Sequence, residues 1–466
     1  MRFQCLPEAP CSHVVEFART QVHQCPDGVS DVMRRFAAIP LNDAEKGCRK
    51  LFVENQCLPP CKVEHVSLGA GALSKFPYLK FSSWAQWLLD SKRLWRLFCG
   101  VSSWEKMREV LAEFWERYRA IRPSHEVDLS RTVPYFSHQD EGRGYKHQAI
   151  MIFSSHGCLG RGTSTYVRRG RRLLPTHRSG LGLNFLGNTW ASQALFMTML
   201  RSTSDANPDA IPTMMEIYAR DASDLGDEGV TSADGQMHIW MIHLNSKADL
   251  PALSKIAGFP RSFAHVPRQV SSRNPCGGIC PWCLAGREAD ANGQCDLPFE
   301  DFSLRPNWLG TIEAEEPWSE EPILMAGQPM DRSMLAHFFA TDIWRNFHLG
   351  IGKHFVANSF VAIIERTNMW AGQSVEKKLQ NLTDAFKQYC KKAKVTPHMM
   401  EISRSTMTWP FSSVAPVGAW SKGSQTTCFM KFLEEFLESN LNDCDDVVIR
   451  AVATCPSDAF HFVELH

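Results

Sequence analysis

Net charge, long apolar runs and low-complexity segments are all missing from this sequence of 466 residues. It carries 50 Lys and Arg residues against 50 Asp and Glu residues, so its formal net charge is zero. By itself, this neutrality argues against a nucleic-acid-binding protein driven by bulk charge. No run of 18 apolar residues occurs, and no basic start leads into a short apolar stretch. We therefore expect a nuclear or cytoplasmic protein without a membrane partner.

Disorder and a disulfide framework are excluded as well. Apolar residues make up 44% of the chain and charged residues 21%, as in ordinary folded proteins. The 16 cysteines are many for an intracellular protein. A disulfide framework needs an oxidising compartment and usually a much shorter chain. We therefore expect most of the thiols to be free and buried, and we find no internal repeats.

Composition and patterning divide the chain into five regions. We expect a Cys- and Pro-containing segment over 1–80, a helical region over 81–140, an α/β core with a basic loop over 141–275, a cysteine knuckle with an acidic insertion over 276–330, and a helical region that completes the core over 331–466.

The α/β core is predicted from alternating strand and helix patterns. The order strand, strand, strand, helix, strand is indicated by the segments 149–153, 180–187, 194–200, 209–225 and 237–245. A further helix should begin near Asp249, because Pro251 suits the first turn of a helix.

A basic block lies inside this core. The stretch from Gly142 to Ser204 has no Asp or Glu but nine Lys and Arg residues. Guanidinium groups bind phosphate oxygens in a planar fork, so arginines gathered on a loop favour contact with DNA. The alternative is a basic face that pairs with acidic segments elsewhere. Six arginines form the candidate nucleic-acid-binding set: Arg161, Arg168, Arg169, Arg171, Arg172 and Arg178.

A cysteine cluster follows the core. Cys276, Cys280 and Cys283 have a spacing that suits one tetrahedral ion, so we predict a structural Zn²⁺ site. A redox pair, plain buried cysteines and a radical S-adenosylmethionine enzyme with an iron–sulfur cluster are the alternatives. Candidates for the fourth zinc ligand are His265, Cys295 and His348.

Two acids are candidates for catalysis. Asp249 follows a predicted strand, and Asp342 lies in a predicted helix. Carboxylates that meet from a strand end and a helix can hold Mg²⁺ and support phosphodiester chemistry. Taken singly, each acid is more typical of a helix cap or a surface residue than of a catalytic site.

Together these residues resemble the transposases of CACTA and Plavaka DNA elements. The likeness rests on the segment from Asp249 to Ala252, on Cys280-x-x-Cys283, and on Asp342 with the later His348-Leu-Gly-x-Gly-Lys. It covers roughly residues 145–370. The resemblance implies an interrupted RNase H-like core of three strands, a helix and a strand. It also implies DNA as partner, Mg²⁺-dependent strand cleavage and transfer, and allows a homo-oligomer.

The sequence departs from this family at the first acid. The family carries that acid on the first core strand, usually as Asp-Gly, whereas the segment 149–153 runs into Ser155-His156-Gly157. Arg345 stands where the family has a histidine. We therefore expect an element-derived protein that keeps DNA binding and has lost cleavage. The alternatives are a zinc-containing nucleic-acid-binding protein without catalysis and the radical enzyme.

Overall fold

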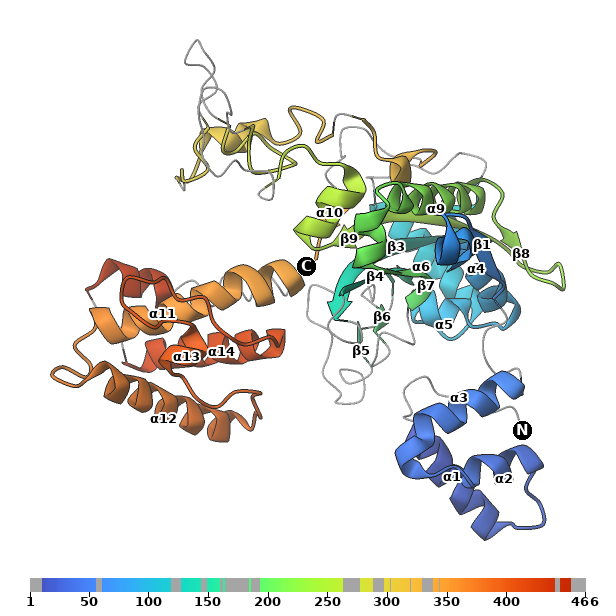
Figure 1. Ribbon diagram of the computed structural model, residues 1–466, viewed down its shortest axis with the longest axis horizontal. Coiled ribbons are helices and arrows are strands. Elements are labelled where there is room, and N and C mark those ends of the chain that lie inside the picture. The colour runs from blue at the N-terminus through green and yellow to red at the C-terminus, as the bar shows by residue number, and fades with distance from the viewer. Residues whose placement is uncertain are drawn as a thin grey trace. The chain divides into compact units, whose positions relative to one another are not determined.

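Two compact units make up the fold, Met1–Ala340 and Thr341–His466 (Figure 1). The computed structural model describes residues 11–55, 61–118, 127–143, 149–159, 162–163, 184–185, 193–262, 277–287, 297–301, 303–318, 320–328, 338–342, 344–440 and 445–453.

A mixed six-stranded sheet organises the first unit. Its strand order is β10-β9-β3-β4-β7, and β8 pairs with β9 outside this path. β4 is antiparallel to both β3 and β7, whereas β9 is parallel to β3. The strands are β3 (Thr132–Arg143), β4 (Ala149–Gly157), β7 (Gln193–Leu200), β8 (Val230–Thr231), β9 (His238–Ala248) and β10 (Phe339–Thr341).

Helix α9 (Ala210–Asp227) packs against this sheet (Figure 1). Apolar residues recur along it at helical spacing, so one stripe can be buried. The ring of Tyr218 lies against the rings of Phe153 and Phe196 at centroid distances of 4.6 and 5.1 Å. These aromatic contacts form the centre of the core between the helix and the sheet.

Three helices before the first core strand extend the same core: α4 (Phe81–Asp90), α5 (Leu94–Cys99) and α6 (Trp104–Arg117). α4 is tied to the sheet because Trp84 Nε1 donates to the carbonyl of Leu195 at 2.9 Å. It is tied to α9 because the buried carboxylate of Asp221 accepts from the backbone and hydroxyl of Ser82. α6 begins with Ser103 as its N-cap.

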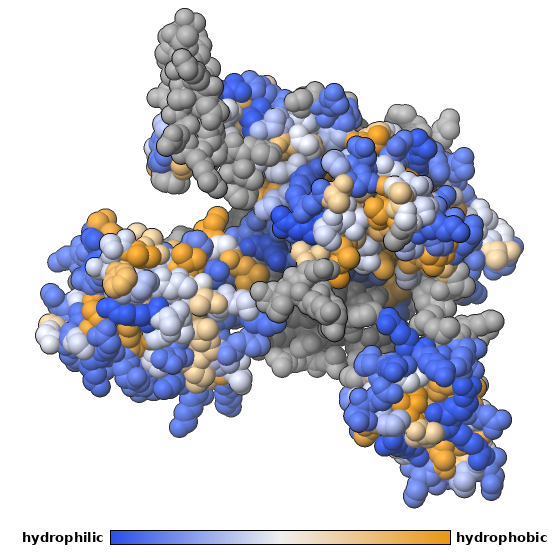
Figure 2. Space-filling view, viewed as in Figure 1, coloured by the Kyte–Doolittle hydropathy of each residue, from blue (hydrophilic) through white to orange (hydrophobic). Residues whose placement is uncertain are grey.

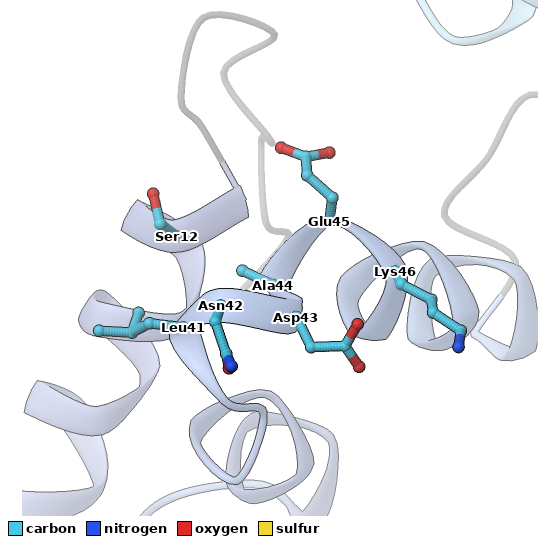
Figure 3. A pocket seen from close by; sticks show the side chains of 7 residues that line it. All are labelled: Ser12, Leu41, Asn42, Asp43, Ala44, Glu45 and Lys46. Carbon is cyan, nitrogen blue, oxygen red and sulfur yellow. The ribbon is translucent and has the colours of Figure 1, made fainter. Parts of the chain in front are cut away.

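The first helices of the chain have a hydrophobic core of their own. α1 (Cys11–Gln24), α2 (Asp31–Ala37) and α3 (Ala44–Glu54) bury residues such as Val15, Phe36 and Cys48 among themselves. Hydrophilic residues predominate on their visible surface (Figure 2). A hollow of about 300 Å³ at the start of α3 is lined by Ser12 and residues 41–46 (Figure 3). No residue of the sheet lines it.

A long excursion separates β9 from its neighbour β10. It contains α10 (Leu250–Ala257), a hairpin-like segment over 277–287, and the short helices η8 (Asn307–Thr311) and η9 (Ile323–Met325). The chain then returns to the sheet, where Ser246 N donates to the carbonyl of Phe338 at 2.7 Å.

The second unit is helical. Its buried aromatic residues, including Phe360, Phe386 and Phe432, pack ring against ring. Its helices are η11 (Trp344–Ile351), α11 (Gly352–Arg366), α12 (Val375–Ala393), α13 (Arg404–Met407) and α14 (Gly423–Asn440). Within the described residues, the stretch Arg345–Arg366 is long and apolar enough to cross a membrane. Half of its apolar window is buried in the fold, so it is weak grounds for a membrane protein.

Several sequence predictions are confirmed. The segments 149–153, 194–200 and 237–245 lie in β4, β7 and β9, and 209–225 lies in α9. The helix predicted to start at Asp249 is α10.

Other predictions are wrong. The first strand of the sheet is β3, which begins inside the region predicted to be helical, and β10 lies in a second such region. Of the segment 180–187, the described residues form only β6 (Asn184–Phe185), which pairs with β5 (Gly162–Thr163) outside the main sheet. β3 was missed because it buries polar residues, which hide the apolar period of a strand.

Candidate functional site

Two acidic residues stand at the carboxyl ends of adjacent parallel strands. The last registered pair between β3 and β9 is His138 with Lys247. Two residues further along the chain lie Asp140, within β3, and Asp249, just after the end of β9. Neighbouring strands are about 4.8 Å apart, and residues two apart point to the same face. Continued by two residues, the parallel register places Asp140 opposite Asp249.

Asp249 is also the N-cap of α10. Its backbone is extended, and its Oδ1 accepts a hydrogen bond from Ala252 N at 2.9 Å. Pro251, in the first turn, lacks an N–H group where none is needed. The cap fixes the direction of the carboxylate and leaves its second oxygen outside this bond.

Glu141 follows Asp140 on β3 and is held by two cations. Its carboxylate lies 3.7 Å from Lys255 Nζ on α10 and 3.5 Å from Arg201 Nη1 on α8 (Arg201–Ala206). These pairs are partly exposed, so each adds little to stability. They do connect the end of β3 to two helices and so restrain the backbone beside Asp140.

A buried polar network lies on the opposite face of the same strands. Ser137 Oγ donates to Ser246 Oγ at 3.0 Å, and Ser246 Oγ lies 3.0 Å from Gln139 Oε1. His243 Nε2 is 2.9 Å from Ser137 Oγ. Burial lowers the pKa of His243 to about 3, so its imidazole is neutral at physiological pH. Hydrogen bonds between β3 and β9 therefore brace the sheet directly behind the acidic edge.

A cation and two imidazoles lie on the acidic face itself. Lys247 Nζ is 4.6 Å from the ring centroid of Phe136, a favourable cation–π geometry. The ring of His156 contacts Phe136 edge-on. His138 lies beside Lys247 in the register. Positive or polar side chains thus accompany Asp140 and Asp249 along two neighbouring strands.

Asp342 and His348 belong to the second unit. Asp342 follows β10 directly in the chain. Burial lowers the pKa of His348, and the nearby carboxylate of Asp342 acts in the opposite direction. Thr427 Oγ1 lies 3.3 Å from His348 Nδ1. Asp249 and the cysteines belong to the first unit, and the approach of Asp342 to Asp249, and of His348 to the cysteines, stays a prediction.

The cysteine segment forms a tight turn between residues 277 and 287. Cys283 is buried and Cys280 is half-buried. The Cys283 thiol donates to the Cys280 sulfur, and the backbone N–H groups of Trp282 and Cys283 donate to it as well. The hydrogen bond from Cys283 is the main cause that lowers the pKa of Cys280, and the same bond together with burial raises the pKa of Cys283.

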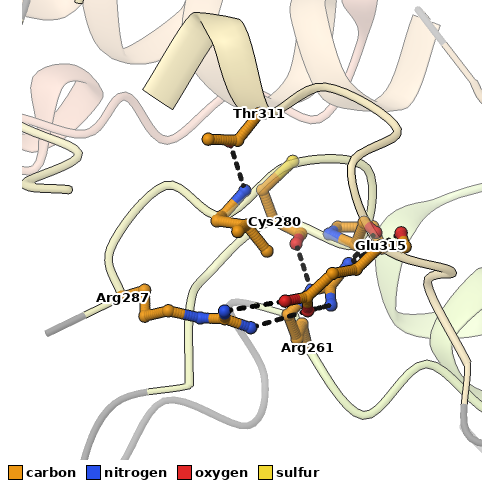
Figure 4. A network of polar contacts seen from close by, with 7 residues as sticks. Arg261, Cys280, Arg287, Thr311 and Glu315 are labelled. Atoms are coloured by element: carbon orange, nitrogen blue, oxygen red, sulfur yellow. Dashed lines mark hydrogen bonds and ion pairs between the residues drawn. The ribbon is translucent and has the colours of Figure 1, made fainter. Parts of the chain in front are cut away.

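An arginine beneath the turn ties it to the rest of the unit (Figure 4). Arg261 Nη2 donates to the Pro281 carbonyl at 3.0 Å, and its Nε donates to the Cys280 carbonyl at 3.4 Å. Arg261 Nη1 pairs with Glu315 at 3.0 Å, and Arg287 grips the same carboxylate with two nitrogens at 2.9 and 2.7 Å. The Glu315 carboxylate is therefore shared by two guanidinium groups.

Several predicted site residues lie outside the described part of the chain. They are three candidate zinc ligands, Cys276, His265 and Cys295, and the six arginines of the predicted phosphate-binding set, Arg161, Arg168, Arg169, Arg171, Arg172 and Arg178. Among the residues that the structure describes, no group of three His, Cys, Asp or Glu side chains is placed to hold a metal ion. The two carboxylates, of Asp140 and Asp249, and the two thiols, of Cys280 and Cys283, are groups of two possible ligands each.

Sequence reasoning missed Asp140 and Glu141. We searched for the first acid after the segment 149–153, which is in fact the second strand of the sheet. A signal for β3 was present: the run from Val133 to Phe136 is rich in β-type residues, and Asp140-Glu141-Gly142 closes it. Asp140 and Glu141 therefore lie on the preceding strand, β3.

Comparison of the sequence with models of known protein families finds no match, and comparison with curated proteins finds none either.

Proposed function

We propose that this chain is a transposase-like, DNA-binding protein derived from a mobile element, and that Asp140 and Asp249 hold Mg²⁺ for phosphodiester chemistry. The observation that carries the proposal is the parallel register of β3 and β9, whose last pair lies two residues before each of these two acids. Asp140 takes the place of the acid that the sequence resemblance lacks. The proposed protein therefore keeps the means for strand cleavage.

The order of elements supports an RNase H-like core. Three strands, β3, β4 and β7, are followed by helix α9 and then by β9. The first and fourth of these strands lie side by side and parallel. This is the succession that the family resemblance implies, with β3 as the first strand. Asp249 directly follows the fourth strand, where the resemblance places the second acid.

The residues at the sheet edge fit a hard divalent cation. Mg²⁺ prefers oxygen ligands and is commonly held by one or two carboxylates together with water and phosphate oxygens. Asp140 and Asp249 provide two carboxylates from backbone segments fixed by a strand and a helix cap. When bound, the ion would activate a water or hydroxyl and neutralise charge on the phosphate. Glu141, restrained by Lys255 and Arg201, would position the strand end beneath it.

Asp342 is proposed as a further acid of the same protein. Its place in the chain supports this role, since it follows β10 and β10 is hydrogen-bonded in the sheet beside β9. The proposal for Asp140 and Asp249 does not depend on it.

The test is metal binding by the full-length protein, followed by cleavage. We expect Asp140→Asn and Asp249→Asn each to weaken Mn²⁺ binding, measured by calorimetry, and to lower Mg²⁺-dependent nicking of duplex DNA by at least about 100-fold. Asparagine caps a helix about as well as aspartate, so Asp249→Asn should leave the unfolding temperature unchanged. Asp27→Asn, at an exposed position in the first unit, is the matched control.

Equal Mn²⁺ affinity in the wild type and in both acid variants would overturn the metal site. Binding of DNA without cleavage in the wild type, with Mn²⁺ binding intact, would limit the protein to a binding role. Nicking that survives both substitutions would assign the activity to other residues.

A further inference from the structure

We propose that the turn from Cys280 to Cys283 binds one Zn²⁺ ion through both sulfur atoms, and that Arg261 holds the turn in its metal-binding shape when the metal is absent. This site is separate from the carboxylates at the sheet edge. The zinc proposal does not depend on the proposed phosphodiester chemistry.

The donor groups of the turn point at its sulfurs. The N–H groups of Trp282 and Cys283 donate to the Cys280 sulfur, and the N–H group of Ala285 donates to Cys283. Hydrogen bonds from N–H groups stabilise charge on the atom that accepts them. The two sulfur atoms lie next to each other, and each accepts from a backbone N–H group of the turn. Two adjacent cysteine sulfurs can bind one ion.

The carbonyl groups of the turn accept hydrogen bonds from other segments of the unit. Those of Cys280 and Pro281 accept from Arg261, and that of Trp282 accepts from Glu313 N at 2.9 Å. Because these carbonyls are bound to the rest of the unit, the peptide planes cannot rotate without breaking those bonds. Their N–H groups consequently stay directed at the sulfurs.

Arg261 is a buried residue with a defined partner. It is 9% exposed, and its guanidinium joins two carbonyls of the turn to the Glu315 carboxylate (Figure 4). Leu284 N, just after the turn, donates to Thr311 Oγ1 at 3.0 Å and adds a second tie to the same segment. The turn is thus held by protein contacts, whereas many small zinc sites are shaped only by the metal.

The chemistry of the donors selects the ion. Thiolates bind Zn²⁺ in tetrahedral sites, whereas Mg²⁺ and Ca²⁺ take oxygen ligands. Two sulfurs two residues apart supply half of such a shell. The other positions accept water or additional Cys and His ligands. Outer contacts that orient ligands are worth about 10- to 100-fold in metal affinity.

The first experiment measures metal content and cobalt spectra of the full-length protein. We expect one zinc per chain in the wild type, and a cobalt-substituted form with sulfur-to-metal charge-transfer absorption. Cys280→Ser and Cys283→Ser should both lose the zinc and the absorption. Cys25→Ser, which changes an exposed cysteine, should keep both.

Zinc retained by both turn variants, iron in place of zinc, or a wild-type protein with no metal and a Cys280–Cys283 disulfide would each overturn the zinc site. None of these results depends on DNA cleavage. A zinc-free protein that still nicks DNA, and a zinc-loaded one that does not, are therefore distinguishable.

The second experiment tests Arg261 as a positioning residue. We expect Arg261→Met to weaken zinc affinity, measured by competition with a chromophoric chelator, by about 10- to 100-fold. Arg305→Met, at an exposed position in the same excursion, should leave it unchanged. Chelation should remove zinc from the wild type without unfolding the sheet. Arg261→Met protein that melts at a lower temperature but binds zinc as tightly as the wild type would reduce Arg261 to a structural role.

Discussion

At the scale of single residues, the first unit places neutral polar groups behind charged ones. His243, Ser137 and Ser246 exchange hydrogen bonds on the buried face of β3 and β9. Asp140, within β3, and Asp249, just after β9, belong to the other face of these strands. A buried network of this kind is stabilising only while every member keeps its partner and its charge state. Protonation of His243 would therefore weaken the hydrogen bonds between β3 and β9, the strands that position the two acids.

This argument gives a pH dependence with a definite sign. His243 has a pKa of about 3 in the folded protein because it is buried, against about 6.5 in an unfolded chain. Between these values the unfolded state binds the extra proton, so the free energy of unfolding falls as the pH drops below about 6.5. The contribution reaches at most about 1.4 kcal/mol per pH unit.

Urea unfolding followed from about pH 7 to about pH 5 measures this slope. His243→Gln keeps a hydrogen-bonding side chain that does not titrate, so its stability should fall less steeply with acid. His65→Gln, at an exposed position on β1 (Val63–Val66), should behave as the wild type. A slope that is the same in all three proteins would mean that other groups set the acid sensitivity.

At the scale of elements, the packing of strand β4 against helix α5 depends on one glycine. A Cβ atom on Gly157 would lie 2.5 Å from the backbone of Phe98 at the end of α5. Backbone cannot move aside as a flexible side chain can. We expect Gly157→Ala to lower the free energy of unfolding by about 1–3 kcal/mol, measured by chemical denaturation.

Gly142→Ala on the neighbouring strand β3 is the matched control. A Cβ atom there meets nothing within 4 Å. The change should stay within about 0.5 kcal/mol of the wild type. Equal losses from both substitutions would point to a general cost of removing glycine from this sheet and not to the contact with α5.

Elements with a clear apolar period were predictable, and those with buried polar residues were not. The sequence signals for β4, β7, α9 and α10 rest on apolar spacing or on a cap, and the structure has all four. β3 buries Ser137 and Gln139, whose partners lie more than 100 residues away on β9. No local pattern reveals such partners. For the same reason Asp249 was found as a candidate from its own strand, whereas Asp140 required the pairing of two strands.

At the scale of the whole molecule, zero net charge conceals an uneven distribution. The acid-free block from Gly142 to Ser204 holds nine cations, and its arginine set lies outside the described residues. If this block binds phosphates, affinity for DNA should fall linearly with salt on logarithmic axes. Replacing Arg168, Arg169, Arg171 and Arg172 by Ala should flatten that slope and weaken all DNA sequences alike.

Filter binding or fluorescence anisotropy over a salt series measures both effects. Replacing four cations of the second unit, Lys377, Lys387, Lys391 and Lys392, removes the same charge from helix α12 and serves as the control. DNA affinity that does not respond to salt, or that the α12 variant reduces as much as the arginine variant, would reject the arginine block as the phosphate-binding surface.

The bond from Ser246 to Phe338 has a consequence for how the protein folds. It closes a loop of about 90 residues that leaves and re-enters the sheet. Each doubling of loop length adds about 0.6 kcal/mol of closure entropy, and distant contacts form late. β10, with three residues, should therefore join a sheet that has already formed from β3, β4, β7 and β9. Amide hydrogen exchange should then be fastest along this last strand, so that the edge beside Asp249 opens and recloses while the rest of the sheet stays protected.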